Sequence, residues 1–159
     1  MQQKLLSQEQ IIKKLESYCA YRERCESEVK QKLVALKVEA GEVDFYLQYL
    51  IENNLLNENR FIDAYTRGKF NSKSWGRRKI AAALQQKKID VNKIKQSIEH
   101  IDEDMYFQRL KRVLEKKNQQ LINEPNENKV KQKLIYFATQ KGYEPDLIFK
   151  VIKTIHKNE

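Results

Sequence analysis

The chain has 159 residues, of which 40% are hydrophobic and 33% are charged, with a formal net charge of +9. This balance is typical of a folded domain and not of a disordered chain. Only four glycines and two prolines occur, and residues of high helix propensity are abundant, so we expect an all-α fold. The longest uninterrupted apolar runs have five residues, whereas a membrane-spanning helix needs about 20. We therefore expect a soluble, cytoplasmic protein with no signal peptide and no membrane contact.

Apolar residues at helical spacing predict nine helices in succession. N-caps, glycines and a proline suggest where these helices begin and end. In chain order, we expect the first four helices over residues 8–21, 27–36, 43–53 and 57–70. The next three are expected over residues 74–84, 91–100 and 103–121. The eighth includes residues 130–137 and ends at Gly142, and the ninth runs from Pro145 through Ile155.

An internal repeat organises these helices. The pentapeptide VKQKL at residues 29–33 recurs unchanged at residues 130–134, and IAAAL at residues 80–84, halfway between them, has the same apolar spacing. Evenly spaced copies of this kind predict tandem three-helix units. We expect units at residues 8–56, 57–101 and 102–159, which together form one elongated, curved repeat domain.

The positive charge is concentrated in the middle unit. Residues 1–57 have a net charge of −1, residues 58–101 have eleven Lys and Arg against four Asp and Glu, or +7, and residues 102–159 have +3. A solvated lysine-rich surface is the ordinary interpretation of such charge. Here the cations gather around the expected start of a helix near Ser74, where unpaired N–H groups also attract anions. This clustering favours an anionic partner.

The candidate binding residues lie between and within the two central helices. Gly76 would either let a phosphate approach the backbone or permit close helix packing. Trp75 would stack on an unpaired base, or seal a gap between helices. On a helical wheel Arg77 lies nearer the apolar stripe than Arg78 and Lys79, so it would stabilise the fold as well as bind. The candidate cations are Arg67, Lys69, Lys73, Arg77, Arg78 and Lys79.

Enzymatic chemistry has no support in the sequence. There is no phosphate-binding G-x-x-x-x-G-K-[ST] loop and no HExxH motif. Cys19 and Cys25 lack the spacing of metal ligands, and His100 and His156 are isolated from each other. We therefore expect no catalytic residue, no metal and no cofactor.

Three segments of the central stretch resemble a known family. They are LLNENRF at residues 55–61, AYTR at 64–67 and KSWGRRKIAAAL at 73–84, and they are similar to the signature of the RecX family of bacterial recombinase regulators. The resemblance covers roughly Ile12 to Ile155. The sequence departs from the family where Asn57 and Glu58 replace an acidic pair. It also departs at the middle helices, of which only the third ends in Lys-Gly, at residues 141–142.

The resemblance implies a non-enzymatic, monomeric modulator of RecA in DNA repair, recombination and the SOS response. Such a protein binds the RecA filament on single-stranded DNA and restrains its assembly, ATP hydrolysis, strand exchange and co-protease activity. The candidate cations would then contact the filament or the phosphates of single- or double-stranded DNA. Two alternatives stay open: a sequence-independent DNA-binding helical protein with no dedicated protein partner, and an interaction scaffold whose charge only keeps it soluble.

Overall fold

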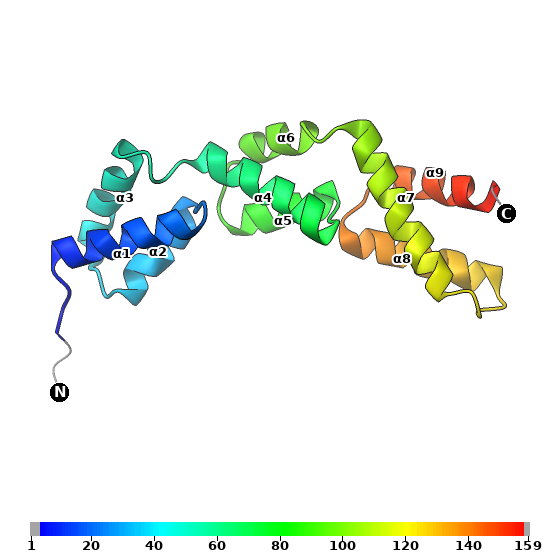
Figure 1. The fold of residues 1–159 in the computed structure, drawn as a ribbon, viewed down its shortest axis with the longest axis horizontal. Helices are drawn as coiled ribbons and strands as arrows, with labels where there is room; N and C mark the ends of the chain where they lie inside the picture. Colours follow the sequence, from blue (N-terminus) through cyan, green and yellow to red (C-terminus); the bar gives the residue numbers. More distant parts are fainter. Residues whose placement is uncertain (1–3, 158–159) are drawn as a thin grey trace. The chain divides into compact units, whose positions relative to one another are not determined.

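All regular structure in the described part of the chain, residues 4–157 of a computed structural model, is helical (Figure 1). The predicted all-α fold of three tandem three-helix repeats is confirmed. Every helix in this range falls short of the length and apolar character needed to span a membrane. The helices are α1 (Gln8–Tyr21), α2 (Glu26–Ala35), the short 3-10 helix η1 (Ala40–Glu42) and α3 (Val43–Glu52) in the first repeat, α4 (Glu58–Lys73), α5 (Arg77–Gln86) and α6 (Val91–Glu99) in the second, and α7 (Glu103–Gln120), α8 (Glu127–Lys141) and α9 (Pro145–Lys157) in the third.

The chain packs as two compact units, which divide within α4. Within the described range, the N-terminal unit ends at Ala64 and the C-terminal unit begins at Tyr65. The first repeat therefore has a core of its own, whereas most of the second repeat packs with the third. The unit boundaries predicted from the sequence and the elongated, curved shape stay predictions.

The core of the N-terminal unit collects the apolar stripes of α1, α2 and α3. Leu15, Val29, Leu33 and Leu50 are completely buried. Each recurs at helical spacing with other apolar residues, so every helix presents one continuous face to its neighbours. Burying a side chain of this size contributes about 1.5–3 kcal/mol, so these four positions contribute substantially to the stability of the unit.

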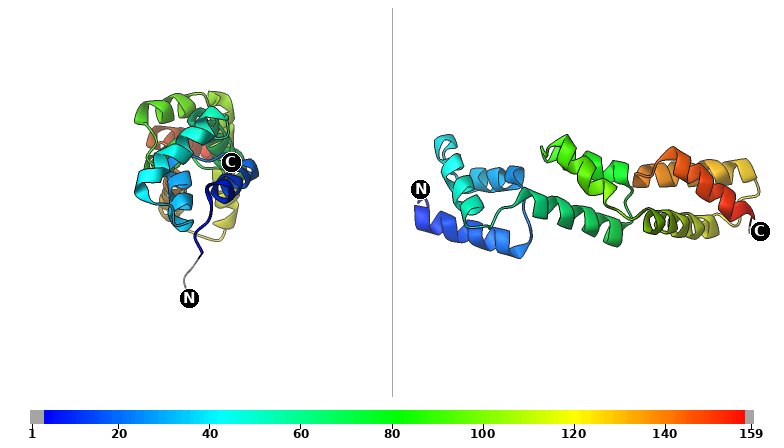
Figure 2. Two further views of the ribbon diagram at one scale, coloured as in Figure 1. Left: turned by 90° about the vertical axis from the view of Figure 1, so that its left-hand side faces the viewer. Right: turned by 90° about the horizontal axis from the view of Figure 1, so that it is seen from above.

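In the C-terminal unit, α7 packs against both α8 and α9, α8 packs against α9, and α5 packs against α6 (Figure 2). Leu110 and Leu114 of α7 are completely buried. The facing residues of the third repeat are equally buried, and they are Leu134, Ala138, Ile148 and Val151. The third repeat is thus a three-helix bundle whose apolar stripes meet along α7.

The repeated pentapeptide is displaced by one helical turn in the third repeat. In 29–33 and 80–84 the first and last residues are completely buried. In α8, Val130 is only half-buried and the completely buried pair is Leu134 and Ala138. Helix α8 has 15 residues, against 10 in α2 and in α5. The additional residues of α8 lie at its start, so the pentapeptide comes one turn earlier than the buried pair. We expected the third copy to occupy positions equivalent to those of the other two, and this prediction is wrong.

All three middle helices end in the same left-handed cap. The residue in this conformation has φ 62° at Lys37, 64° at Lys88 and 98° at Gly142. In each case the next N–H donates to the carbonyl five residues earlier, as in a Schellman motif. The departure from Lys-Gly predicts weaker helix-end geometry in the first two middle helices, and this prediction is wrong, because the same cap is present at all three ends. Lysine adopts a conformation there that glycine favours.

Changing Lys37 or Lys88 to glycine should stabilise the protein. The left-handed conformation costs a non-glycine residue about 1–2 kcal/mol, and the flexibility of glycine in the unfolded chain returns about 0.5–1 kcal/mol. We expect each variant to gain about 0.5–1 kcal/mol in the free energy of unfolding, measured with urea. As a control, Lys14→Gly in the middle of α1 should lose about 1 kcal/mol. A loss at all three positions would contradict a strained cap.

Candidate functional site

The turn between α4 and α5 begins later than the sequence predicts. Asn71 and Ser72 still belong to α4, which ends at Lys73. Ser74 lies in the left-handed region with φ 55°, and the N-cap of α5 is Gly76. The predicted break at Asn71 and the predicted cap at Ser74 are therefore wrong. The prediction of a cap at Asn57 is confirmed, since its side-chain oxygen accepts the N–H of Arg60 at 3.0 Å.

Side chains of the third repeat hold this turn in place. The hydroxyl of Tyr143 donates to the carbonyl of Ser74 at 2.8 Å, and Arg109 donates to the carbonyl of Asn71 at 3.0 Å. The rings of Phe70 and Tyr106 stack with centroids 6.0 Å apart, and the ring of Tyr143 packs against Tyr106 at a tilt of 44° with centroids 5.2 Å apart. The turn that carries the candidate residues is therefore fixed by packing.

The first N–H groups of α5 are used within the protein. Because two of them meet the last carbonyls of α8, the positive end of one helix lies against the negative end of the other, a favourable arrangement of dipoles. The expectation that these N–H groups attract phosphate is wrong. In order, the N–H of Gly76 donates to the carbonyl of Lys141 at 2.7 Å, that of Arg77 to the hydroxyl of Tyr106 at 3.0 Å, and that of Arg78 to the carbonyl of Gly142 at 2.9 Å.

Two glycines make this helix joint possible. A Cβ atom added to Gly76 would lie 2.4 Å from the carbonyl carbon and oxygen of Gly142. A Cβ atom added to Gly142 would lie 2.4 Å from the Cβ of Lys79. Of the two interpretations of Gly76, close helix packing is therefore the one that the structure supports.

Arg77 lies inside the joint and not on the surface. Its guanidinium contacts Glu103 at 2.8 Å and Glu144 at 3.0 Å, and it stacks 3.8 Å from the ring centroid of Tyr106. Only 13% of its side chain is exposed. The hydroxyl of Tyr106 donates to the carboxylate of Glu144. Burial, and then this hydrogen bond, raise the pKa of Tyr106 far above its usual value. Arg77 thus stabilises the fold.

Three lysines and two aromatic rings form a cation–aromatic face on α4, the turn after it, and α5 with its C-cap. The Nζ atoms of Lys69 and Lys79 lie 5.0 and 4.6 Å from the ring centroid of Trp75. Lys69 and Lys87 lie 5.4 and 5.9 Å from the ring centroid of Tyr65. All five side chains are half-buried, so the lysine stems pack while their ammonium groups reach solvent. Cation–π contacts of about 0.5–1 kcal/mol each hold the positive charges beside the rings.

Three further candidate cations are exposed on the same repeat. Arg67, Lys73 and Arg78 form no ion pair with any residue in the range 4–157. We call these three the exposed cations. Of the six cations predicted from the sequence, the structure thus exposes three, places Lys69 and Lys79 at Trp75, and buries Arg77 in the joint.

Lys87 was not predicted. It lies eight residues after Lys79, a spacing that puts both on neighbouring parts of one helix face, and this periodicity could have indicated it. Arg109 and Glu144 were also missed, because their partners lie 35 or more residues away in the chain. No local pattern signals contacts of that range.

The described residues hold no cluster of three His, Cys, Asp or Glu side chains that could bind a metal ion. Cys19 and Cys25 are buried free thiols, and burial raises the pKa of both. A raised thiol pKa lowers the thiolate fraction, so neither sulfur is activated as a nucleophile.

Two family models match adjacent parts of the chain. The model of the second three-helix domain of RecX matches residues 57–98, and the model of the third three-helix domain of RecX matches residues 103–152. These matched ranges contain the whole cation–aromatic face and the exposed cations.

Similar proteins and structures agree with these matches. A regulatory protein RecX of Clostridium perfringens is 28% identical over 137 residues, which are 86% of this chain and 64% of that protein. A regulatory protein RecX of Oceanobacillus iheyensis is 25% identical over 142 residues, 89% of this chain and 52% of that protein. The chain thus spans between about half and two thirds of the length of these relatives.

Two solved structures share the fold. The crystal structure of RecX from Lactobacillus salivarius has a TM-score of 0.82 at 20% identity, and covers 93% of this chain and 96% of its own. A crystal structure of regulatory protein RecX has a TM-score of 0.79 at 21% identity, and covers 96% of this chain and 81% of its own. At this level of identity the likeness concerns the fold alone.

Proposed function

The chain belongs to the RecX family of regulatory proteins, and on this premise we propose that it modulates RecA, the recombinase that polymerises on single-stranded DNA. It binds the RecA nucleoprotein filament and restrains filament assembly, ATP hydrolysis and strand exchange, without catalysis of its own. A cytoplasmic location and a monomeric state belong to the same proposal.

One observation supports the proposal: the cation–aromatic face and the exposed cations both belong to the second repeat, whose net charge is +7. A polymer of nucleic acid and protein offers closely spaced negative charges, and a surface of fixed cations matches them at several points at once. Contacts of this kind, repeated along a filament, bias its assembly against its disassembly. Arg77 is excluded from this surface because it is paired with two glutamates.

The test is the titration of RecA on single-stranded DNA with the wild type and with the variant Arg67→Ala, Lys73→Ala, Arg78→Ala. We expect the wild type to inhibit ATP hydrolysis at a small fraction of the RecA concentration. Exposed charge pairs contribute about 0.2–1 kcal/mol each, so three together contribute about 1.4 kcal/mol and the variant should need about ten times more protein for half inhibition.

A matched control removes three exposed lysines elsewhere, in the variant Lys13→Ala, Lys14→Ala, Lys150→Ala. This control has the same net charge as the test variant, but its lysines lie outside the second repeat, so it should inhibit as the wild type does. Equal potency of all three proteins would contradict a role for the exposed cations. Absence of any effect of the wild type on RecA would contradict the proposed function.

The second candidate is a DNA-binding protein with no dedicated protein partner. The rings of Tyr65 and Trp75 beside lysines favour it, since such a surface binds nucleic acid by itself. If Arg67, Lys69, Lys73, Arg78 and Lys79 meet duplex phosphates, the logarithm of the binding constant should fall with the logarithm of salt at a slope of about −4 to −5. This slope, combined with no effect on RecA, would support the second candidate.

A further inference from the structure

A second place on the molecule combines aromatic rings with cations, in the third repeat. Helices α7 and α8 border an open hollow of about 310 Å³. None of its residues belongs to the cation–aromatic face or to the exposed cations. The hollow is lined by Lys117, Gln132, Lys133, Tyr136 and Phe137.

The two aromatic rings of the hollow differ in their exposure to solvent. Phe137 is half-buried, with Lys117 Nζ 4.9 Å and Lys141 Nζ 5.8 Å from its ring centroid. The neighbouring Tyr136 is 68% exposed. Two cations are therefore already held at the inner ring, while the outer ring offers an open π-face to a ligand. Planar aromatic ligands bind to such a face by stacking.

The charge around the hollow is positive. Residues 103–141 contain nine Lys and Arg against five Asp and Glu. Among the lining lysines, Lys133 lies 3.6 Å from Glu124, in a pair whose lysine is 53% exposed, and an exposed pair of this kind is worth about 0–1 kcal/mol. Lys117 has no acidic partner within residues 4–157. A ligand that fits this hollow therefore has a flat aromatic group with negative charge on either side.

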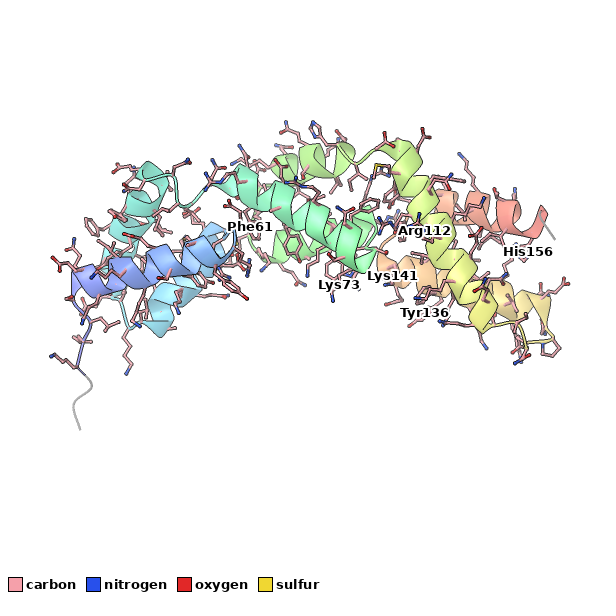
Figure 3. All side chains as sticks on the ribbon, viewed as in Figure 1. Phe61, Lys73, Arg112, Tyr136, Lys141 and His156 are labelled. Carbon is pink, nitrogen blue, oxygen red and sulfur yellow. The ribbon has the colours of Figure 1, made fainter. Side chains whose placement is uncertain are left out.

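The hollow is also connected to the exposed cations. The Nζ atom of Lys141, at the end of α8, donates to the carbonyl of Lys73 at 3.1 Å. Figure 3 labels Lys73, Lys141 and Tyr136, which follow one another from the end of α4 along α8. A flexible, negatively charged strand that leaves the hollow along α8 can thus meet first Lys141 and then Lys73.

We propose that this hollow binds an unpaired base of single-stranded DNA. The base stacks on Tyr136, its edge lies within reach of the Gln132 amide, and the flanking phosphates meet Lys117 and Lys133. Duplex DNA does not fit the site, because its bases are stacked on one another and present no open face. An acidic peptide would satisfy the lysines but would leave the face of Tyr136 without a planar partner. This inference goes beyond the proposed function, since it assigns a DNA site to the third repeat, outside the cation–aromatic face and the exposed cations, and requires no RecA.

The test measures binding of a fluorescein-labelled oligothymidylate and of a labelled duplex of equal length, by fluorescence anisotropy, in the absence of RecA. Stacking of one base contributes about 1–3 kcal/mol, so Tyr136→Ala should weaken single-strand binding between about fivefold and about 150-fold. Duplex binding should change less than about twofold. Tyr136→Phe keeps the ring and should bind both DNAs as the wild type does.

A second readout locates the contact directly. An oligonucleotide with 5-iododeoxyuridine should form a photochemical cross-link to the peptide that contains Tyr136, identified by mass spectrometry. Equal weakening of single-strand and duplex binding by Tyr136→Ala would overturn the proposal, as would unchanged single-strand binding. Unchanged single-strand binding with weaker binding to DNA-free RecA would identify the hollow as a protein-docking site. Since the DNA assay contains no RecA, its failure leaves the proposed function untouched.

Discussion

Gly76→Ala should destabilise the C-terminal unit by about 3 kcal/mol. The new methyl group would lie 2.4 Å from the backbone of Gly142, and neither backbone can move without separating α5 from α8. Separation breaks the hydrogen bonds from Gly76 to Lys141 and from Arg78 to Gly142. The loss therefore combines overpacking with the breaking of two buried hydrogen bonds.

The single tryptophan makes this loss measurable, since Trp75 lies next to the substituted glycine. Urea unfolding followed by its fluorescence reports on the C-terminal unit. Gly68→Ala is the matched control, because a Cβ atom there would meet no other atom within 4 Å. In the interior of α4 alanine is favoured over glycine, so this control should gain about 0.5–1 kcal/mol. A midpoint for Gly76→Ala equal to that of the wild type would show that the joint is looser than described.

The same joint shows what the sequence could predict and what it could not. Helix positions follow from the local spacing of apolar residues, and most of them were predicted to within a few residues. The cap at Asn57 and the stop at Gly142 were also local signals. Such features depend on contacts within one or two turns, which the order of residues reveals directly.

The features that could not be predicted from the sequence depend on contacts between the second and third repeats. Ser74 has the sequence position of an N-cap, but its carbonyl accepts a hydrogen bond from Tyr143 and its hydroxyl accepts one from Arg109, both in the third repeat. Arg77 looks like part of a binding surface, but Glu144, 67 residues later, pairs with it. The wheel correctly indicated that Arg77 lies near the apolar stripe, yet nothing local identified its partner. Tertiary packing overrides local preference at these positions.

The joint also changes how the basic cluster works. A helix start with unpaired N–H groups would add its dipole to the attraction for phosphate, but the C-terminus of α8 already occupies this position. Attraction for an anionic partner must therefore come from side chains alone, namely the exposed cations and the lysines of the cation–aromatic face. Their attraction is screened by salt, since they lie at the surface.

Above about pH 10, the C-terminal unit should lose stability steeply because of Tyr106 and Tyr143. Both hydroxyls are completely buried, and burial is the main cause that raises both pKa values far above the usual 10.0. The folded protein therefore keeps two protons that the unfolded chain releases near its ordinary tyrosine pKa. A raised pKa contributes stability that is fully present below pH 10 and is lost as the pH rises towards the folded value.

The slope of unfolding free energy against pH reports on Tyr143. One retained proton costs about 1.4 kcal/mol of unfolding free energy per pH unit in this range. Tyr143→Phe should therefore reduce the slope between about pH 10 and 11 by about 1 kcal/mol per unit, because the unfolded tyrosine is only half ionised at pH 10. The variant also loses the hydrogen bond to Ser74 at every pH. Urea unfolding of wild type and variant at matched pH values gives both slopes. Both proteins contain the same lysines, so the difference between the two slopes isolates the tyrosine.

Tyr136→Phe is the control, because its ring is exposed in the folded protein and solvent reaches its hydroxyl in both states. It should leave the slope as in the wild type. Equal slopes for Tyr143→Phe and the wild type would contradict a buried hydroxyl at this position. That result would also argue against the packing of Tyr143 on the turn after α4, and hence against the fixed position of the residues that carry the cation–aromatic face.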